Sequence, residues 1–204
     1  MNPGVSFLMF LQRKMSFTKM LCYSLAQCIG AILAASLVWG SASDLSDQSS
    51  YEEAFDGPPF LLGSTTLDKQ ISSGNGFLLE LMGSFFFYFV ISQTALDTTG
   101  IAKTSLPAIP IGFSLVVVHI CLVPFTGCGV NPARTFGPAM VVCMSSKEDC
   151  KLAVGGWWWI YYIGPLLGAL MVAEVTYLLE WDVDEVYPET KEEDKEVEAE
   201  ASEA

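Results

Sequence analysis

The residues best suited to chemistry lie in two Asn-Pro segments at distant positions of the chain. Asn131–Arg134 falls in a Gly-rich break, Thr126–Met140, that interrupts uncharged hydrophobic sequence. An arginine at lipid depth with no evident partner is expensive, which marks Arg134 as a functional residue. A looser copy opens the chain, and we name the copies the first Asn-Pro box, Asn2, Pro3 and Gly4, and the second Asn-Pro box, Asn131, Pro132 and Ala133. Two such boxes predict a pore built from an internal repeat.

Hydrophobic stretches long enough to cross a bilayer surround these boxes. Of the 204 residues, 51% are hydrophobic and 16% charged, and the mean hydropathy is +0.42, which is unlike a soluble domain. About 20 apolar residues span the hydrocarbon, and four stretches qualify: Met20–Trp39, Gly74–Leu96, Ser105–Pro124 and Leu152–Leu179. Cys128–Met144 is shorter and rich in helix breakers, which predicts a re-entrant loop and half-helix. The sequence therefore indicates an all-α, multi-pass membrane protein.

The order of boxes and spans predicts an inverted repeat. An odd number of spans separates the two boxes, so the boxes enter the membrane from opposite faces. Ile29–Leu33 parallels Ile163–Leu167 at a similar distance after each box, and we expect each segment to place a small residue at a close helix–helix contact. We expect four full transmembrane helices and two re-entrant half-helices, with the first two helices of a six-helix fold absent.

The net charge of −13 is concentrated at the C-terminal end. Eleven acidic residues occur from Asp182 onward, against Lys191 and Lys195. This composition predicts a disordered acidic segment. A solvated tail is the simpler interpretation, and a partner-binding tail is the alternative. We divide the chain into a membrane domain, residues 1–180, and a tail, residues 181–204.

Basic residues near the first span favour one orientation in the membrane. Arg13, Lys14 and Lys19 flank its start, and cytoplasmic loops carry an excess of Lys and Arg. The first span then runs outward, Gly40–Ser73 forms an external loop, and the tail ends in the cytoplasm. We expect an integral, multi-pass protein of the plasma membrane or of an internal membrane.

Signals for covalent or metal chemistry are weak. The six cysteines and the single histidine have no metal-ligand spacing, and the sequence contains no Ser–His–Asp set or phosphate loop. We expect no enzyme activity, no metal or other cofactor, and no nucleic-acid partner. Most of the cysteines are interpreted as small packing residues, while a disulfide between Cys143 and Cys150 in an external loop stays open.

At three places the sequence resembles the aquaporin, or major intrinsic protein, family. His119–Ala139 is close to the signature of the family's second box, Ser24–Ala35 resembles its third helix, and Trp157–Leu170 resembles its sixth. The resemblance implies a water-selective channel with an hourglass pore in each protomer of a homo- or hetero-tetramer in the lipid bilayer. Both Asn side chains would then contact water at the pore centre. Gly4 departs from the alanine of the family's box and lacks the methyl group that packs the boxes together.

The resemblance also implies a selectivity filter formed by His119, Cys128 and Arg134. A satisfied core histidine is the competing interpretation of His119, and its spacing to the other two residues favours the filter. Thr135 follows Arg134 where glycerol channels have aspartate, and the Tyr161–Tyr162 pair is typical of water channels. These details favour water over glycerol.

Two glutamates fall inside the expected spans. Glu80 resembles a family glutamate that supports the re-entrant loop by accepting its backbone N–H groups. Glu174 lies near the cytoplasmic end of its span, where its side chain can reach headgroup water.

Two other functions compete with a water channel. The first is a channel for small neutral solutes such as glycerol, urea or peroxide. The second is a non-conducting, truncated subunit that joins full-length relatives and modulates them. Solute uptake assays distinguish a neutral-solute channel from a water channel. Co-purification with a longer relative would identify a modulatory subunit.

Overall fold

The computed structural model describes residues 2–41, 61–96 and 104–186, with the backbone alone for residues 180–186. The described residues are helices joined by turns and short extended segments. The elements are α1 (Pro3–Leu11), α2 (Phe17–Ser41), α4 (Ser73–Ile91), the π-helical turn η2 (Ser92–Leu96), α5 (Ala108–Thr126), α6 (Pro132–Ser145), α7 (Lys147–Ala153) and α8 (Ile160–Val186).

Four of these helices are long and apolar enough to cross a membrane: Phe17–Ser41, Ser73–Leu96, Ala108–Thr126 and Ile160–Leu179. The four expected spans are therefore confirmed as helices, with one correction. The last span does not begin at Leu152, because that residue belongs to α7 and α8 begins at Ile160. Gly155 and Gly156 lie between the two helices, and glycine weakens a continuous helix.

The two short helices α1 and α6 begin in the same way, one after each Asn-Pro box. Asn2 caps α1 with φ −151° and ψ 117°, and Asn131 caps α6 with φ −154° and ψ 106°. A proline follows each asparagine, at a helix position where the missing N–H is not needed. The same local chemistry therefore starts both half-helices of the predicted repeat.

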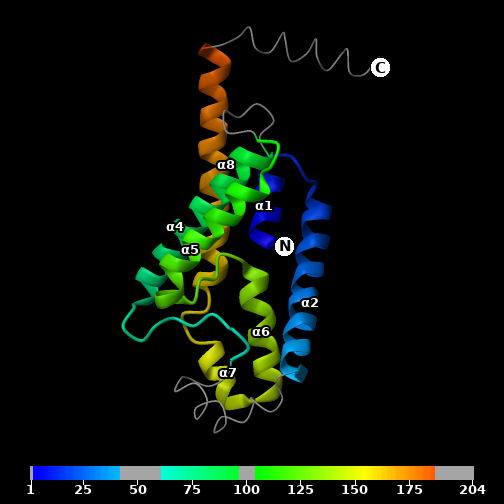
Figure 1. Ribbon diagram of the computed structural model, residues 1–204, viewed down its shortest axis with the longest axis vertical. Coiled ribbons are helices and arrows are strands. Elements are labelled where there is room, and N and C mark those ends of the chain that lie inside the picture. The colour runs from blue at the N-terminus through cyan, green and yellow to red at the C-terminus, as the bar shows by residue number, and fades with distance from the viewer. Residues whose placement is uncertain (1, 42–60, 97–103, 187–204) are drawn as a thin grey trace.

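The half-helices pack against long helices of the other repeat unit (Figure 1). α1 packs against α8 as well as against α2, and α6 packs against α2, while α4 packs against both α5 and α8. From their N-termini in the middle of the molecule, α1 and α6 run toward opposite ends. Three long helices, α2, α4 and α5, separate them in the chain, as expected for an inverted repeat.

Small residues allow two of these helix pairs to approach closely. A β-carbon on Gly137 would lie 2.5–2.6 Å from backbone and side-chain atoms of Ala31, so α6 touches α2 there. A β-carbon on Gly164 would lie 3.1 Å from Cβ of Glu80, where α8 meets α4. Each segment therefore places a small residue at a close helix contact, as expected. In the second segment this residue is Gly164, and in the first it is Ala31, because no atom lies within 4 Å of a β-carbon built on Gly30.

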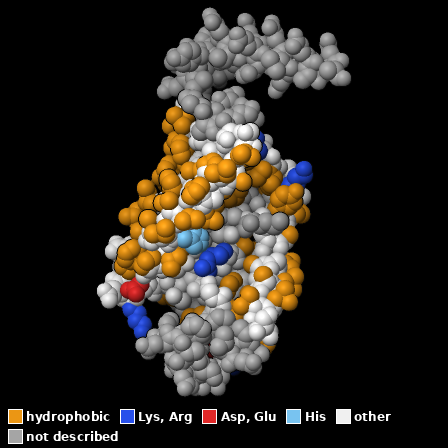
Figure 2. All heavy atoms as spheres, in the orientation of Figure 1, with side chains coloured by type: hydrophobic (Ala, Val, Ile, Leu, Met, Phe, Trp, Pro, Cys, Tyr) orange, Lys and Arg blue, Asp and Glu red, His pale blue; other side chains and the backbone are white. Residues whose placement is uncertain are grey.

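The outer surface of the long helices is apolar (Figure 2). Leu25, Leu33 and Leu37 on α2 are 61–73% exposed, and Phe113 and Ile120 on α5 are 70% and 72% exposed. In water such a surface would favour aggregation, whereas hydrocarbon accommodates it without a penalty. The molecule is therefore built for a lipid environment.

The expected domain boundary at residues 180 and 181 falls inside α8, which continues to Val186. The first residues assigned to the acidic tail are thus helical in their backbone. Residues 187–204 lie outside the described part of the chain, so the division into domain and tail stays a prediction.

Candidate functional site

The two Asn-Pro boxes meet in the middle of the molecule. Nδ2 of Asn2 donates a hydrogen bond of 2.8 Å to the carbonyl oxygen of Val130, the residue directly before the second box. Asn2 is 8% exposed and Asn131 is half-buried. Residues 128 positions apart in sequence therefore share one polar junction.

Both asparagine side chains also cap their own helices. Oδ1 of Asn2 accepts from the backbone N–H of Gly4 at 2.9 Å, and Oδ1 of Asn131 accepts from Ala133 and Arg134 at 3.0 and 3.3 Å. Because capping uses the carbonyl end of each amide, the NH₂ end is turned away from the helix. The helix N-termini themselves carry partial positive charge.

Glu80 holds the loop that leads into the second box. Its Oε1 atom accepts from the hydroxyl group of Thr126 at 2.6 Å and from the N–H of Gly129 at 2.8 Å. Its Oε2 atom accepts from the N–H of Val130 at 2.7 Å. Glu80 has no exposed surface, so these three donors replace the hydration that a buried carboxylate loses.

The backbone of this loop needs that support because it contains unusual conformations. Cys128 and Val130 have φ of 54° and 42°, a backbone region that residues other than glycine rarely adopt. Gly129 lies between them, and a β-carbon there would contact the ring of Tyr161 and lie 2.8 Å from Oε2 of Glu80. The hydroxyl group of Tyr161 donates to the carbonyl oxygen of Thr126 at 2.6 Å.

Arg134 lies in the first turn of α6, and its side chain is held by two carbonyl groups. Its NH1 group donates to Gly63 at 2.6 Å and its NH2 group donates to Gly127 at 3.3 Å. Nearby, the hydroxyl group of Thr65 donates to that of Thr135 at 3.0 Å, and both residues are fully buried. Residues 61–66, which the sequence assigned to an external loop, thus fold inward, where Gly63 holds Arg134 and Thr65 contacts Thr135.

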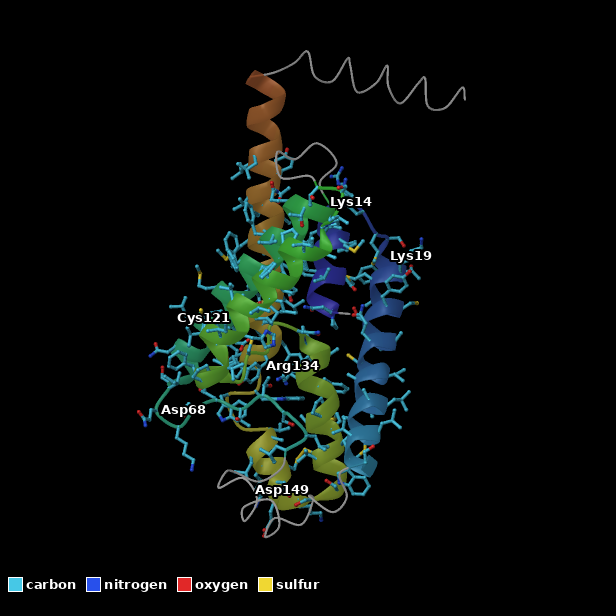
Figure 3. All side chains as sticks on the ribbon, in the orientation of Figure 1. Lys14, Lys19, Asp68, Cys121, Arg134 and Asp149 are labelled. Carbon is cyan, nitrogen blue, oxygen red and sulfur yellow. A yellow bond between two sulfur atoms is a disulfide. The ribbon has the colours of Figure 1, made fainter. Side chains whose placement is uncertain are left out.

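His119 and Arg134 lie on the same face of the molecule. Both are half-buried, and Figure 2 shows the histidine in pale blue near the centre of the face where Figure 3 labels Arg134. Nδ1 of His119 is 2.8 Å from the carbonyl oxygen of Leu115, one turn earlier on α5. This contact leaves Nε2 as the ring nitrogen for other partners.

Cys128 is not on this exposed face. The residue is 0% exposed and belongs to the core cluster that contains Val118 and Leu122 of α5. Its left-handed backbone, with φ of 54°, accompanies this inward placement. The structure brings His119 and Arg134 to one surface and leaves Cys128 beneath it, so a filter role for Cys128 stays a prediction.

Several contact residues of this site are not among those that the sequence predicts. They include Gly63 and also Tyr88, whose hydroxyl group donates to the carbonyl oxygen of Val130 at 2.8 Å. Tyr161 is predicted only as part of an aromatic pair. Gly63 has φ of 71°, a backbone conformation that favours glycine. The glycine in the sequence is therefore a signal for a turn at this position. For Tyr88, the only sequence signal is a polar hydroxyl group within an otherwise apolar stretch.

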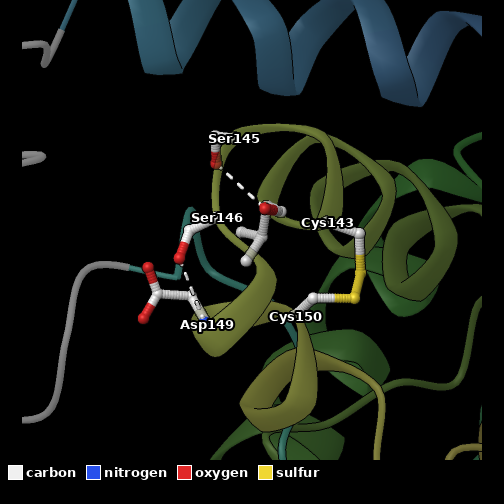
Figure 4. The surroundings of a disulfide bond; sticks show 6 residues. Cys143, Ser145, Ser146, Asp149 and Cys150 are labelled. Carbon is white, nitrogen blue, oxygen red and sulfur yellow. Dashed lines mark hydrogen bonds between the residues drawn. A yellow bond between two sulfur atoms is a disulfide. The ribbon is translucent and has the colours of Figure 1, made fainter.

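Charged residues lie in two separate regions of the molecule. Figure 3 labels Lys14 and Lys19 in its upper half, near α1 and α2, and Asp149 near its lower end, in α7, which carries both basic and acidic residues. Next to Asp149, a disulfide bond joins Cys143 at the end of α6 to Cys150 in α7 (Figure 4). The pairing that the sequence left open is therefore present, and the Oγ atom of Ser146 caps α7 beside it by accepting from the N–H of Asp149 at 3.2 Å.

The helices and the paired boxes define a class of protein: a multi-pass membrane protein made of two inverted units whose half-helices meet at their N-termini. A family model of the major intrinsic proteins matches residues 1–177. The chain therefore belongs to the major intrinsic protein family, which is a family of channels and not of enzymes.

Curated relatives support the same family. The chain is 35% identical over 176 residues to aquaporin PIP2-4 of Zea mays, covering 84% of this chain and 54% of the relative. It is 35% identical to aquaporin PIP2-1 of Arabidopsis thaliana, with 84% and 55% covered, and 33% identical to aquaporin PIP1-1 of the same plant. The chain spans about half the length of these relatives.

A solved structure has the same fold. The aquaglyceroporin from Plasmodium falciparum superposes with a TM-score of 0.70, covering 85% of this chain and 69% of that chain. The sequence identity is 19%, so the likeness concerns the fold alone.

Proposed function

We propose that the chain forms a passive water channel in which the two Asn-Pro boxes lie at the pore centre. One observation carries the proposal: the 2.8 Å hydrogen bond from Asn2 to Val130 joins the N-termini of two oppositely directed half-helices. A pore through this junction passes two helix N-termini and two asparagine amides at the same depth. The relatives at 33–35% identity are named aquaporins, which supports water as the permeant.

Cation exclusion follows from the charge at this junction. Each helix N-terminus is equivalent to roughly +0.5 elementary charge, and neither box carries an acidic side chain to offset it. A cation entering from either side therefore meets a positive barrier in a low-dielectric region. A water molecule, in contrast, accepts hydrogen bonds from the asparagine amides through its oxygen. With its oxygen held there, it cannot easily relay protons to its neighbours.

The proposed filter lies at Arg134 and His119, with Cys128 as its third expected member. Two carbonyl groups hold the guanidinium group of Arg134 at 2.6 and 3.3 Å, so its charge is fixed in position. His119 contributes a polar ring on the same face. A fixed cation excludes other cations, and the two side chains narrow the passage against solutes larger than water.

The orientation that we propose places the tail in the cytoplasm. The basic residues Arg13, Lys14 and Lys19 lie near one another in residues 2–41, which contain no acidic residue, and the positive-inside rule assigns such a basic region to the cytoplasm. The disulfide between Cys143 and Cys150 lies away from this region, beside Asp149 near the lower end of the molecule in Figure 3, and disulfides persist in oxidising compartments outside the cytosol. Two independent signals therefore favour the same orientation, in the plasma membrane or an internal membrane.

A tetramer of such protomers is part of the proposal. The apolar outer surfaces of α2 and α5 suit contact with either lipid or a neighbouring protomer. Native mass spectrometry of the protein released from detergent micelles distinguishes a single protomer from a tetramer. A tetramer of this chain has about four times the 22.2 kDa of one copy.

The test of the function is permeability of the purified chain in liposomes, measured by stopped-flow light scattering under osmotic gradients. The proposal expects fast shrinkage in an impermeant osmolyte and slow uptake of glycerol and urea, without proton leak. Faster uptake of glycerol than of water would establish the neutral-solute alternative. No permeability, together with co-purification of a longer relative from native membranes, would establish the modulatory subunit instead.

A further inference from the structure

The side chain of Tyr88 on α4 lies where the two half-helices meet. Its hydroxyl oxygen is 2.8 Å from the carbonyl oxygen of Val130 and 3.2 Å from Oδ1 of Asn2. A phenol has one proton to donate, so the shorter contact is the principal hydrogen bond and the contact with Asn2 is its weaker branch. Tyr88 has no exposed surface. One buried side chain from a third helix therefore contacts a polar group of each half of the site.

Glycine at position 4 is what admits this tyrosine. A β-carbon on Gly4 would overlap the hydroxyl oxygen of Tyr88 and would lie 2.8 Å from its Cζ atom and 3.1 Å from its Cε2 atom. Gly4 lies within α1 and has no left-handed backbone to explain its identity. The space that the phenol occupies explains it, because an alanine there would force Tyr88 or α1 to move.

We propose that Gly4 and Tyr88 form a matched pair, in which Tyr88 is a positioning residue that fixes the amide of Asn2. Oδ1 of Asn2 lies against two donors, the N–H of Gly4 at 2.9 Å and the hydroxyl group of Tyr88 at 3.2 Å. Nδ2 therefore points the other way, and it donates one of its two hydrogens to Val130. This role deepens the proposed function and rests on it where it concerns the passage of water.

The carbonyl oxygen of Val130 gains a second donor in the same arrangement. It accepts from Asn2 at 2.8 Å and from Tyr88 at 2.8 Å, which uses both of its lone pairs. Val130 has φ of 42°, a sparsely populated conformation that persists only when its surroundings determine it. Tyr88 therefore fixes the direction of this carbonyl group as well as the direction of the Asn2 amide.

A simpler interpretation makes Tyr88 an ordinary core aromatic residue. It belongs to the core cluster with Leu8 and Phe87, and its ring centroid is 5.8 Å from that of Phe87. On that interpretation the hydroxyl group is dispensable and alanine at position 4 is tolerated after small shifts. Two experiments separate the interpretations, one for the steric match and one for the hydrogen bonds.

The steric experiment measures the apparent melting midpoint of the full chain in detergent for Gly4→Ala, Tyr88→Val and the double variant. Gly30→Ala is the matched control, because no atom lies within 4 Å of a β-carbon there. We expect Gly4→Ala to lower the midpoint by about 5 °C or more, and Tyr88→Val to remove most of this effect. Gly30→Ala should not lower the midpoint, because alanine favours a helix over glycine and meets no neighbour there. A Gly4→Ala protein that melts like Gly30→Ala, or losses that simply add in the double variant, would overturn the match.

The hydrogen-bond experiment compares Tyr88→Phe with Tyr23→Phe, since Tyr23 is a 52% exposed tyrosine on α2. The readout is the ¹⁵N shift of the Asn2 side-chain amide in bilayers, in protein labelled at its three asparagines. We expect Tyr88→Phe, and not Tyr23→Phe, to move this signal and to lower the water permeability about threefold to tenfold, as for the loss of one hydrogen bond.

The Asn2 amide signal tests the positioning role of Tyr88 separately from the proposed water channel. An Asn2 signal that is the same in Tyr88→Phe and in the unmodified protein would overturn the positioning role, whatever the permeability. A signal that moves while even the unmodified chain conducts no water would support the positioning role and reject the water channel.

Discussion

The buried carboxylate of Glu80 accepts a hydrogen bond of 2.7 Å from the backbone N–H of Val130, fifty residues later in the chain. Together with the bonds from Thr126 and Gly129, this contact ties α4 to the loop that ends at the second Asn-Pro box. The loop has few alternatives for its N–H groups, because the carboxylate is fully buried and unsatisfied donors at such depth are costly.

Replacing Glu80 by glutamine tests this relationship. The amide keeps the shape but has one acceptor oxygen instead of two, so its NH₂ group faces a backbone donor. We expect Glu80→Gln to destabilise the protein by about 1–3 kcal/mol, measured by unfolding in SDS. Glu174→Gln is the control, since Glu174 is exposed on α8. Equal stability of the two variants would contradict the supporting role of Glu80.

Asn131→Asp separates helix capping from conduction. Aspartate caps a helix as well as asparagine does, and its charge is favourable at a helix N-terminus, so we expect the protein to stay folded. The NH₂ donor is lost, however, and a negative charge replaces it. We therefore expect about tenfold lower water permeability and a measurable cation leak in liposomes.

Asn75→Asp is the matched control for this substitution, because Asn75 is exposed near the start of α4. If Asn131→Asp conducted water and excluded cations as Asn75→Asp does, Asn131 would be a helix cap and nothing more.

Arg134→Val tests the filter. The substitution removes the fixed charge and releases the carbonyl groups of Gly63 and Gly127, so the passage becomes wider and less positive. We expect glycerol and urea uptake to rise about tenfold and proton exclusion to weaken. The measurement is liposome swelling with a pH-sensitive dye inside, and Lys151→Val on the exposed surface of α7 is the control. Unchanged solute and proton exclusion would place the filter elsewhere.

The disulfide between Cys143 and Cys150 tests both stability and orientation. It closes a loop of about eight residues, and we expect its removal in Cys143→Ser/Cys150→Ser to lower stability by roughly 2–3 kcal/mol. In intact cells or vesicles of native orientation, a membrane-impermeant maleimide should label these two cysteines only after reduction. Cys22→Ser, at an exposed free cysteine, is the stability control. Labelling that requires permeabilised membranes would reverse the proposed orientation.

Much of the fold was predictable because its causes are local. Uninterrupted apolar stretches predict helices in any lipid-facing protein, and all four expected spans are present as helices. An asparagine followed by proline predicts a capped helix start, and both boxes form one with nearly equal backbone angles. The sequence did not show which small residue makes a given contact, because Gly30 and Ala31 are neighbours and only packing selects which of them touches Gly137.

The apolar pattern of the sequence did not predict where α8 begins. Leu152 is apolar and continues the hydrophobic stretch, yet it belongs to α7, which is capped by Ser146 and joined to α6 by the disulfide. Gly155 and Gly156 lie between the two helices, and because glycine weakens a continuous helix, they separate α7 from α8 despite the apolar sequence.

The sequence by itself determined what each part of the chain can do: which stretches suit lipid, which residues begin the half-helices, and that Glu80 and Arg134 need partners. Only the tertiary structure decided which residues those partners are. Gly63 lies 71 residues from Arg134, and Tyr88 lies 42 residues from Val130. Such contacts depend on the relative placement of whole helices, and one backbone carbonyl group looks like any other in the sequence. The sequence therefore shows that a buried charged side chain requires a hydrogen-bond partner, while the packing of the helices determines which group is that partner.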